Sequence, residues 1–129
     1  MAGQGDVTVR EIMSTDIVSV GPSATVAEAA TLMGKLHVGS ALVMDGDQVL
    51  GIFTERDIVR ALAADFDAAG HVVTDWMTAQ PATVEPDLSA RAALDRMLAA
   101  GYRHLPVVEN GATVGIVSIR DLSRAAVER

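Results

Sequence analysis

Two short stretches of the chain carry hydroxyl, carboxylate and guanidinium groups at the same spacing. Residues 51–57 read GIFTERD and residues 115–121 read GIVSIRD, so Thr54 and Ser118 are each followed three positions later by an aspartate. This spacing is typical of a helix cap, in which the hydroxyl accepts a backbone N–H and the carboxylate favours the positive end of the helix dipole. Capping alone is therefore one interpretation of both stretches.

A second interpretation is a binding site for a phosphorylated sugar. Asp57 and Asp121 are acceptor-only groups that can take both hydroxyls of a ribose diol. A helix N-terminus offers unpaired N–H groups to a phosphate, and Arg56 and Arg120, directly before the aspartates, supply positive charge. A helix cap needs no arginine at this position, and it accepts Glu or Gln in place of the aspartate. The pattern therefore favours binding.

The two stretches lie 64 residues apart because the sequence is duplicated. Residues 8–61 align with residues 72–125 without a gap, and 13 of the 54 aligned pairs are identical. Chance gives roughly three or four such pairs at average residue usage. Each copy also keeps a glycine, Gly51 or Gly115, at the start of its motif, which indicates that another group approaches the backbone there.

Hydrophobic patterns and turn signals predict the order strand, helix, strand, strand, helix in each copy. Thr25 and Glu28 form a capping box before the first helix, and Asp45-Gly46 and Asn110-Gly111 are the predicted hairpin turns. The predicted elements of the first copy are strand 17–20, a helix from 26, strands 41–44 and 49–53 and helix 58–64. Those of the second are strand 82–84, a helix from near Asp87 to Gly101, strands 105–108 and 113–117 and helix 122–127.

The predicted fold class is α+β, with two β-α-β-β-α repeats packed about a pseudo-two-fold axis. Repeat 1 spans residues 7–64, a connector spans 65–71, repeat 2 spans 72–127, and residues 1–6 form a flexible tail. Neither repeat, at about 60 residues, buries its sheet alone, so the two must share a core. Arg60 and Arg124 also repeat and are expected to pair with exposed acids, whereas Trp76, aligned with Ile12, is expected to pack before a strand.

The composition of the chain argues against several classes of function. A net charge of −7 and a pI near 4.7 argue against a nucleic-acid partner, and no apolar run is long enough to enter a membrane. The absence of cysteine excludes disulfides and thiol chemistry, and His37, His71 and His104 lack metal-ligand spacing. With no secretory signal and no assembled catalytic group, we expect a cytoplasmic protein that is not an enzyme and holds no metal.

The duplicated unit ending in G-h-x-[T/S]-x-x-D resembles the tandem cystathionine-β-synthase (CBS) domain pair, also called a Bateman module. The resemblance covers residues 7 to about 127, and the stretch YRHLPVVENGATVGIVSIRD, 102–121, is especially similar to a CBS unit. It implies a regulatory module that binds adenosine nucleotides such as AMP, ADP or ATP in clefts between the two repeats. It also implies a homodimer, with the apolar faces of the repeat helices as the candidate interface.

The resemblance implies roles for twelve residues. The ribose diol is held by Asp57 and Asp121, and ribose or phosphate oxygens by Thr54 and Ser118. Phosphate faces the basic groups Arg56, Arg120, Arg103 and His104, and adenine lies against the first strands at Ser19, Val20, Thr83 and Val84. Residues 38–40 of the first copy have no basic group where the second has Arg103 and His104, so we expect the two clefts to differ in affinity.

Three hypotheses follow. The first is an adenosine-nucleotide sensor that needs no cofactor, takes the nucleotide as a regulatory ligand and signals to a protein partner in trans. The second is a CBS-type dimerisation or interaction module with vestigial sites, in which the T/S-x-x-D motifs only cap helices. The third is a module that binds a metal or a nucleic acid.

Overall fold

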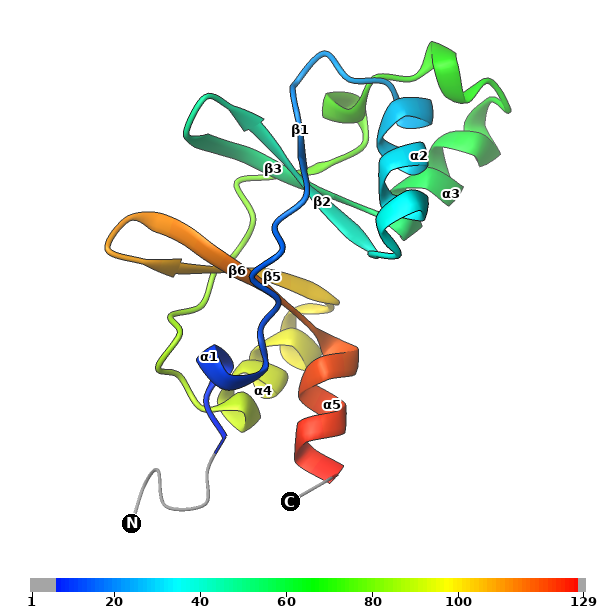
Figure 1. Cartoon of the computed structure of the whole chain (residues 1–129). Helices are drawn as coiled ribbons and strands as arrows, with labels where there is room; N and C mark the ends of the chain where they lie inside the picture. The colour runs from blue at the N-terminus through cyan, green and yellow to red at the C-terminus, as the bar shows by residue number, and fades with distance from the viewer. Residues whose placement is uncertain (1–6, 128–129) are drawn as a thin grey trace. The chain divides into compact units, whose positions relative to one another are not determined.

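The chain divides into two packing units, seen here in a computed structural model that describes residues 7–127 (Figure 1). Unit 1 combines residues 7–17 with residues 82–127, and unit 2 is the continuous segment 18–81. The chain thus leaves unit 1 after residue 17 and returns to it at residue 82. The flexible tail predicted for residues 1–6 lies outside the described residues.

Unit 2 is built on a four-stranded sheet in the order β1-β2-β3-β4. Strand β1 (Ser19–Val20) runs parallel to β2 (Ser40–Asp45), whereas β3 (Gln48–Thr54) pairs antiparallel with both β2 and β4 (Thr78–Ala79). The helical elements of this unit are α2 (Val26–Leu36), α3 (Glu55–Ala64) and the 3₁₀ turns η1 (Ala68–Gly70) and η2 (Val73–Asp75).

Unit 1 is built on an antiparallel hairpin of β5 (His104–Glu109) and β6 (Ala112–Ser118). Its helices are α1 (Val9–Ile12), α4 (Ala90–Ala100) and α5 (Ile119–Val127). The strand predicted at 82–84 is reduced to one parallel bridge between Val84 and Val107. Its backbone reaches β5 only at Val84, whose N–H donates to Pro106 O at 3.1 Å and whose carbonyl accepts from Val108 N–H at 2.9 Å.

Capping residues set the ends of the long helices α2 and α4. Thr25 and Glu28 exchange hydrogen bonds of 3.1 and 2.8 Å, which confirms the capping box of α2. Helix α4 begins later than predicted, because Ser89 rather than Asp87 caps it by accepting from Ala92 N–H at 3.1 Å. It ends as predicted at Gly101, with φ +78°.

The two hairpin turns use positive φ angles. Asn110 and Gly111 have φ of +53° and +79°, which confirms the predicted turn. The first turn was predicted one residue too early, because Asp45 still pairs with Gln48 and the turn is made by residues 46 and 47. Gly46 takes φ +60° there, as the first central residue of such a turn often does.

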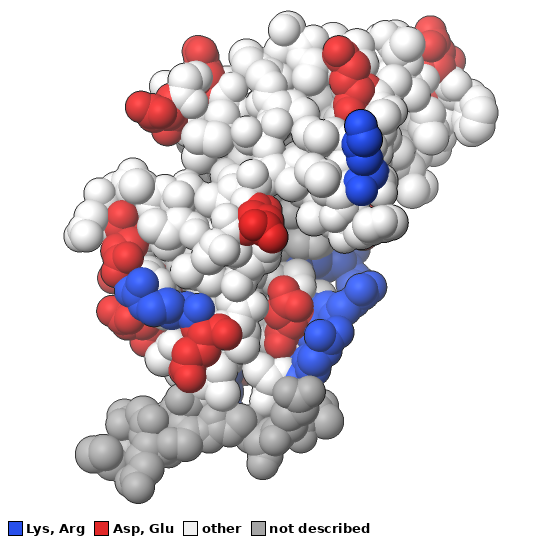
Figure 2. Space-filling model, in the orientation of Figure 1, with Lys and Arg blue, Asp and Glu red and all other residues white. Residues whose placement is uncertain are grey.

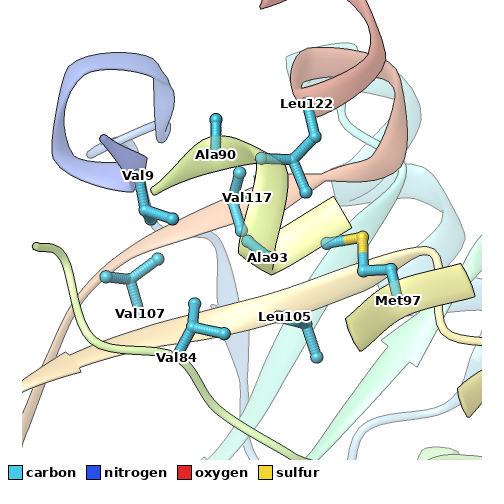
Figure 3. Close-up of a cluster of buried hydrophobic side chains, with 9 residues drawn as sticks. All are labelled: Val9, Val84, Ala90, Ala93, Met97, Leu105, Val107, Val117 and Leu122. Atoms are coloured by element: carbon cyan, nitrogen blue, oxygen red, sulfur yellow. The ribbon is translucent and has the colours of Figure 1, made fainter. Parts of the chain in front are cut away.

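The cores show that the leading segments of the two sequence repeats are exchanged. Val9 of α1 packs with the side chains of α4, α5, β5 and β6 in the unit 1 core (Figure 3). Val73, at the aligned position of the second repeat, belongs to the unit 2 core instead. The segment that precedes each repeat's first strand therefore completes the hydrophobic core around the other repeat's sheet.

Candidate functional site

The second motif lies where β6 meets α5 in unit 1. Ser118 is the last residue of β6, and its Oγ accepts from the backbone N–H of Asp121 at 3.1 Å, which caps the first turn of α5. The carboxylate of Asp121 is partly exposed and makes no hydrogen bond or ion pair with any residue between 7 and 127. The capping bond thus uses the backbone N–H of Asp121 and not its carboxylate.

Three basic residues lie beside this motif: Arg103 directly before β5, His104 at the start of β5, and Arg120 in α5. His104 pairs directly with Ser118 in the β5–β6 ladder, and the backbone carbonyl of Arg103 accepts from Ile119 N–H at 2.8 Å. Arg120 is exposed in the first turn of α5. Unit 1 therefore brings the backbones of five predicted site residues together: Arg103, His104, Ser118, Arg120 and Asp121.

The four residues predicted to contact adenine differ in how exposed they are. Val84 is 2% exposed and belongs to the unit 1 core (Figure 3), whereas Thr83 beside it is exposed. In unit 2, Ser19 is exposed and Val20 is partly buried, and strand β2 lies between their strand and β3. If adenine stacks on these strands, Thr83 and Ser19 offer more accessible surface than Val84.

The first motif has the same sequence pattern but different contacts. Asp57 is only 4% exposed, and its Oδ2 accepts from the backbone N–H of Thr54 at 2.9 Å and from its hydroxyl at 3.2 Å. Its Oδ1 accepts from Arg60 Nη1 at 2.9 Å. Both carboxylate oxygens of Asp57 are therefore engaged within unit 2.

Arg60 is in turn held by Trp76. The guanidinium carbon lies 5.5 Å from the centre of the indole ring, and Nη1 is 3.4 Å from the Trp76 carbonyl oxygen. The His71 ring packs edge-on against the same indole at 5.4 Å, and its Nε2 lies 2.7 Å from the carbonyl oxygen of Asp65. We name Asp57, Arg60 and Trp76 the Asp57 cluster.

The sequence did not indicate the Asp57 cluster as a unit. Arg60 was expected to pair with an exposed acid, but its partner is the buried Asp57. The i,i+3 spacing of these two residues on one helix was the signal that could have found the pair. The contribution of Trp76 could not be found in this way, because it depends on the exchanged leading segment.

Unit 2 has fewer basic groups around its motif than unit 1. Ser40 pairs with Thr54 across the β2–β3 ladder, where unit 1 has His104 opposite Ser118. Gly39 supplies the carbonyl that accepts from Glu55 N–H at 3.1 Å, which is the role that Arg103 has in unit 1. Arg56 is exposed. The difference between the copies expected from the sequence thus lies directly beside the motif.

The repeated glycines contact the chain itself. A Cβ on Gly51 would lie 2.5 Å from Met77 Sδ and 2.7 Å from Thr78 O. A Cβ on Gly115 would lie 2.7 Å from Met13 Sδ and 2.8 Å from the carbonyl of the next residue. The predicted close approach to the backbone therefore comes from the exchanged leading segments, and these glycines need no ligand to explain them.

Charged side chains of both signs occur on the face drawn in Figure 2. In unit 1, Arg10 contacts Glu109 through two nitrogens, at 2.5 and 3.4 Å, and Asp87 at 3.4 Å. The hydrogen bond with Glu109 raises the pKa of the Arg10 guanidinium, and the same bond holds the pKa of Glu109 below its ordinary value. This cluster ties α1 to β5 at the surface.

The described residues hold neither a cluster of metal ligands nor a helix that could span a membrane. Among residues 7–127, no three His, Asp or Glu side chains come together as ligands for a metal ion. No helix within that range has the length and apolar character that crossing a bilayer requires.

Comparison with known proteins places the chain in a family. The CBS domain family matches residues 9–64 and again residues 73–128. A 17.7 kDa protein of Acidianus ambivalens is 44% identical over 93% of this chain and 73% of its own length. Other curated relatives are longer, and this chain spans 15% to 61% of three of them.

Solved structures give the same family. A CBS-domain protein of Agrobacterium tumefaciens is 33% identical, with a TM-score of 0.87 over 93% of this chain and 99% of that one. The CBS domain pair of protein MJ0100, crystallised in complex with 5′-methylthioadenosine and S-adenosyl-L-methionine, is 25% identical, with a TM-score of 0.86 over 95% of this chain and 98% of that one. The expected α+β architecture of two repeats is thereby confirmed. The chain belongs to the CBS domain family and carries two CBS repeats.

Proposed function

We propose that this chain is a regulatory module that binds an adenosine-containing nucleotide at the Ser118–Asp121 motif of unit 1. The observation that carries the proposal is the carboxylate of Asp121, which has no partner among the described residues although its backbone N–H is already used by Ser118. A partly exposed, unpaired acid beside a helix N-terminus is a suitable acceptor for the two hydroxyls of a ribose.

The surrounding residues suit the rest of a nucleotide. The N–H groups of Ile119 and Asp121 in the first turn of α5 are already bonded, so what this helix end offers an anion is the positive end of its dipole. Arg103, His104 and Arg120 lie next to Ser118 in sequence or across the ladder, so their side chains are near enough to supply positive charge to a phosphate. This local concentration of basic groups matters because the whole chain has a net charge of −7.

The MJ0100 domain pair supports the ligand class. The two ligands named with that structure share an adenosine group and differ at the 5′ position. Because that pair matches this chain over both repeats, adenosine is the part of the ligand that we carry over. The 5′ substituent is then chosen by the basic groups of unit 1, and we propose a phosphate.

A binding titration tests the proposal. Nucleotide-free protein is titrated calorimetrically with AMP, ADP, ATP and S-adenosyl-L-methionine, with the guanosine nucleotides as ligand controls. Asp121→Asn should weaken adenosine binding by about 10- to 100-fold, which corresponds to losing one charged hydrogen-bond partner. The matched control is Asp95→Asn, at an exposed position of α4. Absence of binding at millimolar concentration, or equal binding by Asp121→Asn, contradicts the proposal.

An interaction module without a ligand is the second candidate. It is favoured by Asp57, whose carboxylate is buried and fully engaged in capping and pairing contacts. In that case both motifs only stabilise their helices, and Asp121→Asn changes the melting temperature without changing any binding.

We also propose that the chain forms a homodimer through its helices. Large apolar side chains remain exposed on α2, α3 and α4, at Leu36, Val59 and Leu98, with exposed fractions of 49%, 67% and 63%. Sedimentation equilibrium of the wild type and of Val59→Glu tests this proposal. A wild type that stays monomeric at 100 µM, on the order of the concentrations at which weak dimers form, contradicts it.

A further inference from the structure

We infer that the chain binds one nucleotide rather than two, because Arg60 and Trp76 commit Asp57 to a structural contact and leave Asp121 as the ribose acceptor. The inference rests on the proposed function. It adds the number of nucleotides bound per chain and the residues that set this number.

The carboxylates of Asp57 and Asp121 differ in their hydrogen bonds and in their burial. Asp57 accepts three hydrogen bonds, from the Thr54 backbone, the Thr54 hydroxyl and Arg60, and is 4% exposed. A ribose diol could reach Asp57 only by displacing these donors, and a buried acid that loses its partners is costly. Asp121 accepts nothing within the described chain and is more exposed. Among residues 7–127, a ligand therefore meets no competing donor there.

Arg60 is held in place by contacts that the aligned Arg124 does not make among residues 7–127. Both repeats have an arginine three residues after the aspartate, Arg60 and Arg124. Only Arg60 makes the ion pair, and it lies over the Trp76 ring at 5.5 Å with Nη1 3.4 Å from the Trp76 carbonyl. Arg124 is exposed and pairs with nothing in residues 7–127.

Trp76 differs in type from the residue aligned with it in the other repeat, Ile12. The exchanged leading segment of unit 2 supplies Trp76, and the aligned residue of unit 1 is Ile12, which packs against the unit 1 core. An indole face attracts a guanidinium, whereas an isoleucine side chain offers no such attraction. The arginine alone is therefore insufficient, and Trp76 is the residue that positions Arg60 on Asp57.

Calorimetry of the intact chain with ADP tests the inference. The wild type should bind one ADP per chain. Asp121→Asn should weaken this event at least tenfold, and Asp57→Asn should leave its affinity within about twofold while lowering the melting temperature. The two substitutions are matched in chemistry and occupy aligned positions, so each serves as the control for the other.

Two further variants address the positioning role of Trp76. Trp76→Ile introduces the residue that unit 1 has at this position, and it should add a second, weaker binding event that disappears when Asp57→Asn is combined with it. Arg60→Gln keeps the indole in place and should give the same second event, so the test remains valid if Trp76→Ile does not fold. Ile12→Trp is the reciprocal change and should weaken the wild-type event.

The outcomes separate the inference from the proposed function. Two equivalents of ADP on the wild type overturn the inference and leave the nucleotide sensor intact. Loss of the single event in Asp57→Asn overturns the inference and also the placement of the nucleotide site at Asp121. A single event that stays single in both Trp76→Ile and Arg60→Gln overturns the role of Arg60 and Trp76. No binding of any adenosine compound to the wild type overturns the proposed function and the inference together.

Discussion

Gly51 and Gly115 show how a residue can be repeated for packing rather than for binding. Each faces the sulfur of a methionine in the leading segment of the other repeat, Met77 and Met13 respectively, and the next backbone carbonyl. A side chain at either position has to push backbone aside, since a carbonyl cannot move away as a side-chain end can.

We expect Gly115→Ala to lower the free energy of unfolding by about 1–3 kcal/mol, the usual cost of overpacking. Gly34→Ala is the control, because Gly34 lies in α2 with no atom within 4 Å of its added Cβ. That change should be neutral or should stabilise by up to about 1 kcal/mol, as replacing glycine within a helix does. Urea unfolding of both variants measures the difference, and a Gly115→Ala protein as stable as Gly34→Ala contradicts the packing account.

The Arg10–Glu109 pair has a pH dependence with a definite sign. The pKa of Glu109 is lower in the folded protein than in the unfolded chain, because Arg10 hydrogen-bonds to its carboxylate. The pair therefore stabilises the fold above the ordinary glutamate pKa of about 4.3, and its contribution is lost as pH falls through the lower folded value. Arg10 stays charged throughout this range, since its own pKa is raised.

Thermal melts of the wild type and Glu109→Gln from pH 7 to pH 3 measure this contribution. The wild type should melt at the higher temperature at pH 7, and the gap should close as the pH falls below about 4.3. Both side chains are solvent-accessible, so the gap should also shrink in high salt. A gap that is unchanged at pH 3 would mean that Glu109 acts through packing rather than through its charge.

At the residue scale the sequence assigned the same role to Asp57 and Asp121, but the contacts of the two aspartates differ. The alignment of Thr54–Asp57 with Ser118–Asp121 predicted two helix-start motifs, and the structure has both. Asp57 and Asp121 differ because of Arg60 and Trp76, and the latter lies 19 residues beyond Asp57. A contact of this kind depends on tertiary packing, which local spacing does not encode.

Helix ends carry the element-scale differences between the repeats. Both α2 and α4 end on a residue in the left-handed region, but α4 uses Gly101 with φ +78° and α2 uses His37 with φ +57°. A residue with a Cβ costs roughly 1–2 kcal/mol in that conformation, whereas glycine has no such penalty.

Gly101→Ala should therefore destabilise the chain by about 1–2 kcal/mol, even though its added Cβ would meet no atom within 4 Å. His37→Gly should stabilise it by up to about 1 kcal/mol, because the strain removed exceeds the entropy that glycine adds to the unfolded chain. Denaturant midpoints for the two variants should move in opposite directions. Movement in the same direction would show that side-chain contacts, not backbone strain, dominate these caps.

Long elements were predictable from the sequence and short ones were not. Helices α2 and α4 have capping residues and repeating apolar positions, and the hairpins have strong turn signals. Helix α1, turn η2 and strand β4 contain four, three and two residues, too few for any periodicity to be visible. They form because distant backbone binds them: the N–H of Val9 in α1 donates to Leu88 O at 2.9 Å, and the N–H of Val73 in η2 donates to Ala24 O at 2.9 Å.

At the scale of the whole molecule, the units that pack are not the units that repeat. A fragment of residues 18–81 keeps every side chain of the unit 2 core, whereas a fragment of residues 7–64 lacks Val73, Trp76 and Met77. We expect the first fragment to show cooperative unfolding and the second to remain largely unfolded.

Circular dichroism melts of the two fragments test this expectation, and their similar lengths make the comparison direct. Val73→Ala in fragment 18–81 is the control, since it removes one fully buried side chain from the leading segment and should cost about 1–3 kcal/mol. Equal folding of fragment 7–64 would show that the exchanged segment is dispensable for the core.

The exchange also sets an order of events on the ribosome. Unit 2 is complete once residue 81 has been synthesised, but residues 7–17 belong to a unit whose remaining part, residues 82–127, has not yet been made. At 5–20 residues per second, those 46 positions take roughly 2–9 s to translate. During that interval Val9 and Met13, apolar residues of the segment that emerges first, have no core to enter. Nascent chains stalled after residues 18–81 have left the ribosome, but before unit 1 is complete, should therefore engage chaperones through residues 7–17, while the unit that begins later in the sequence is already folded.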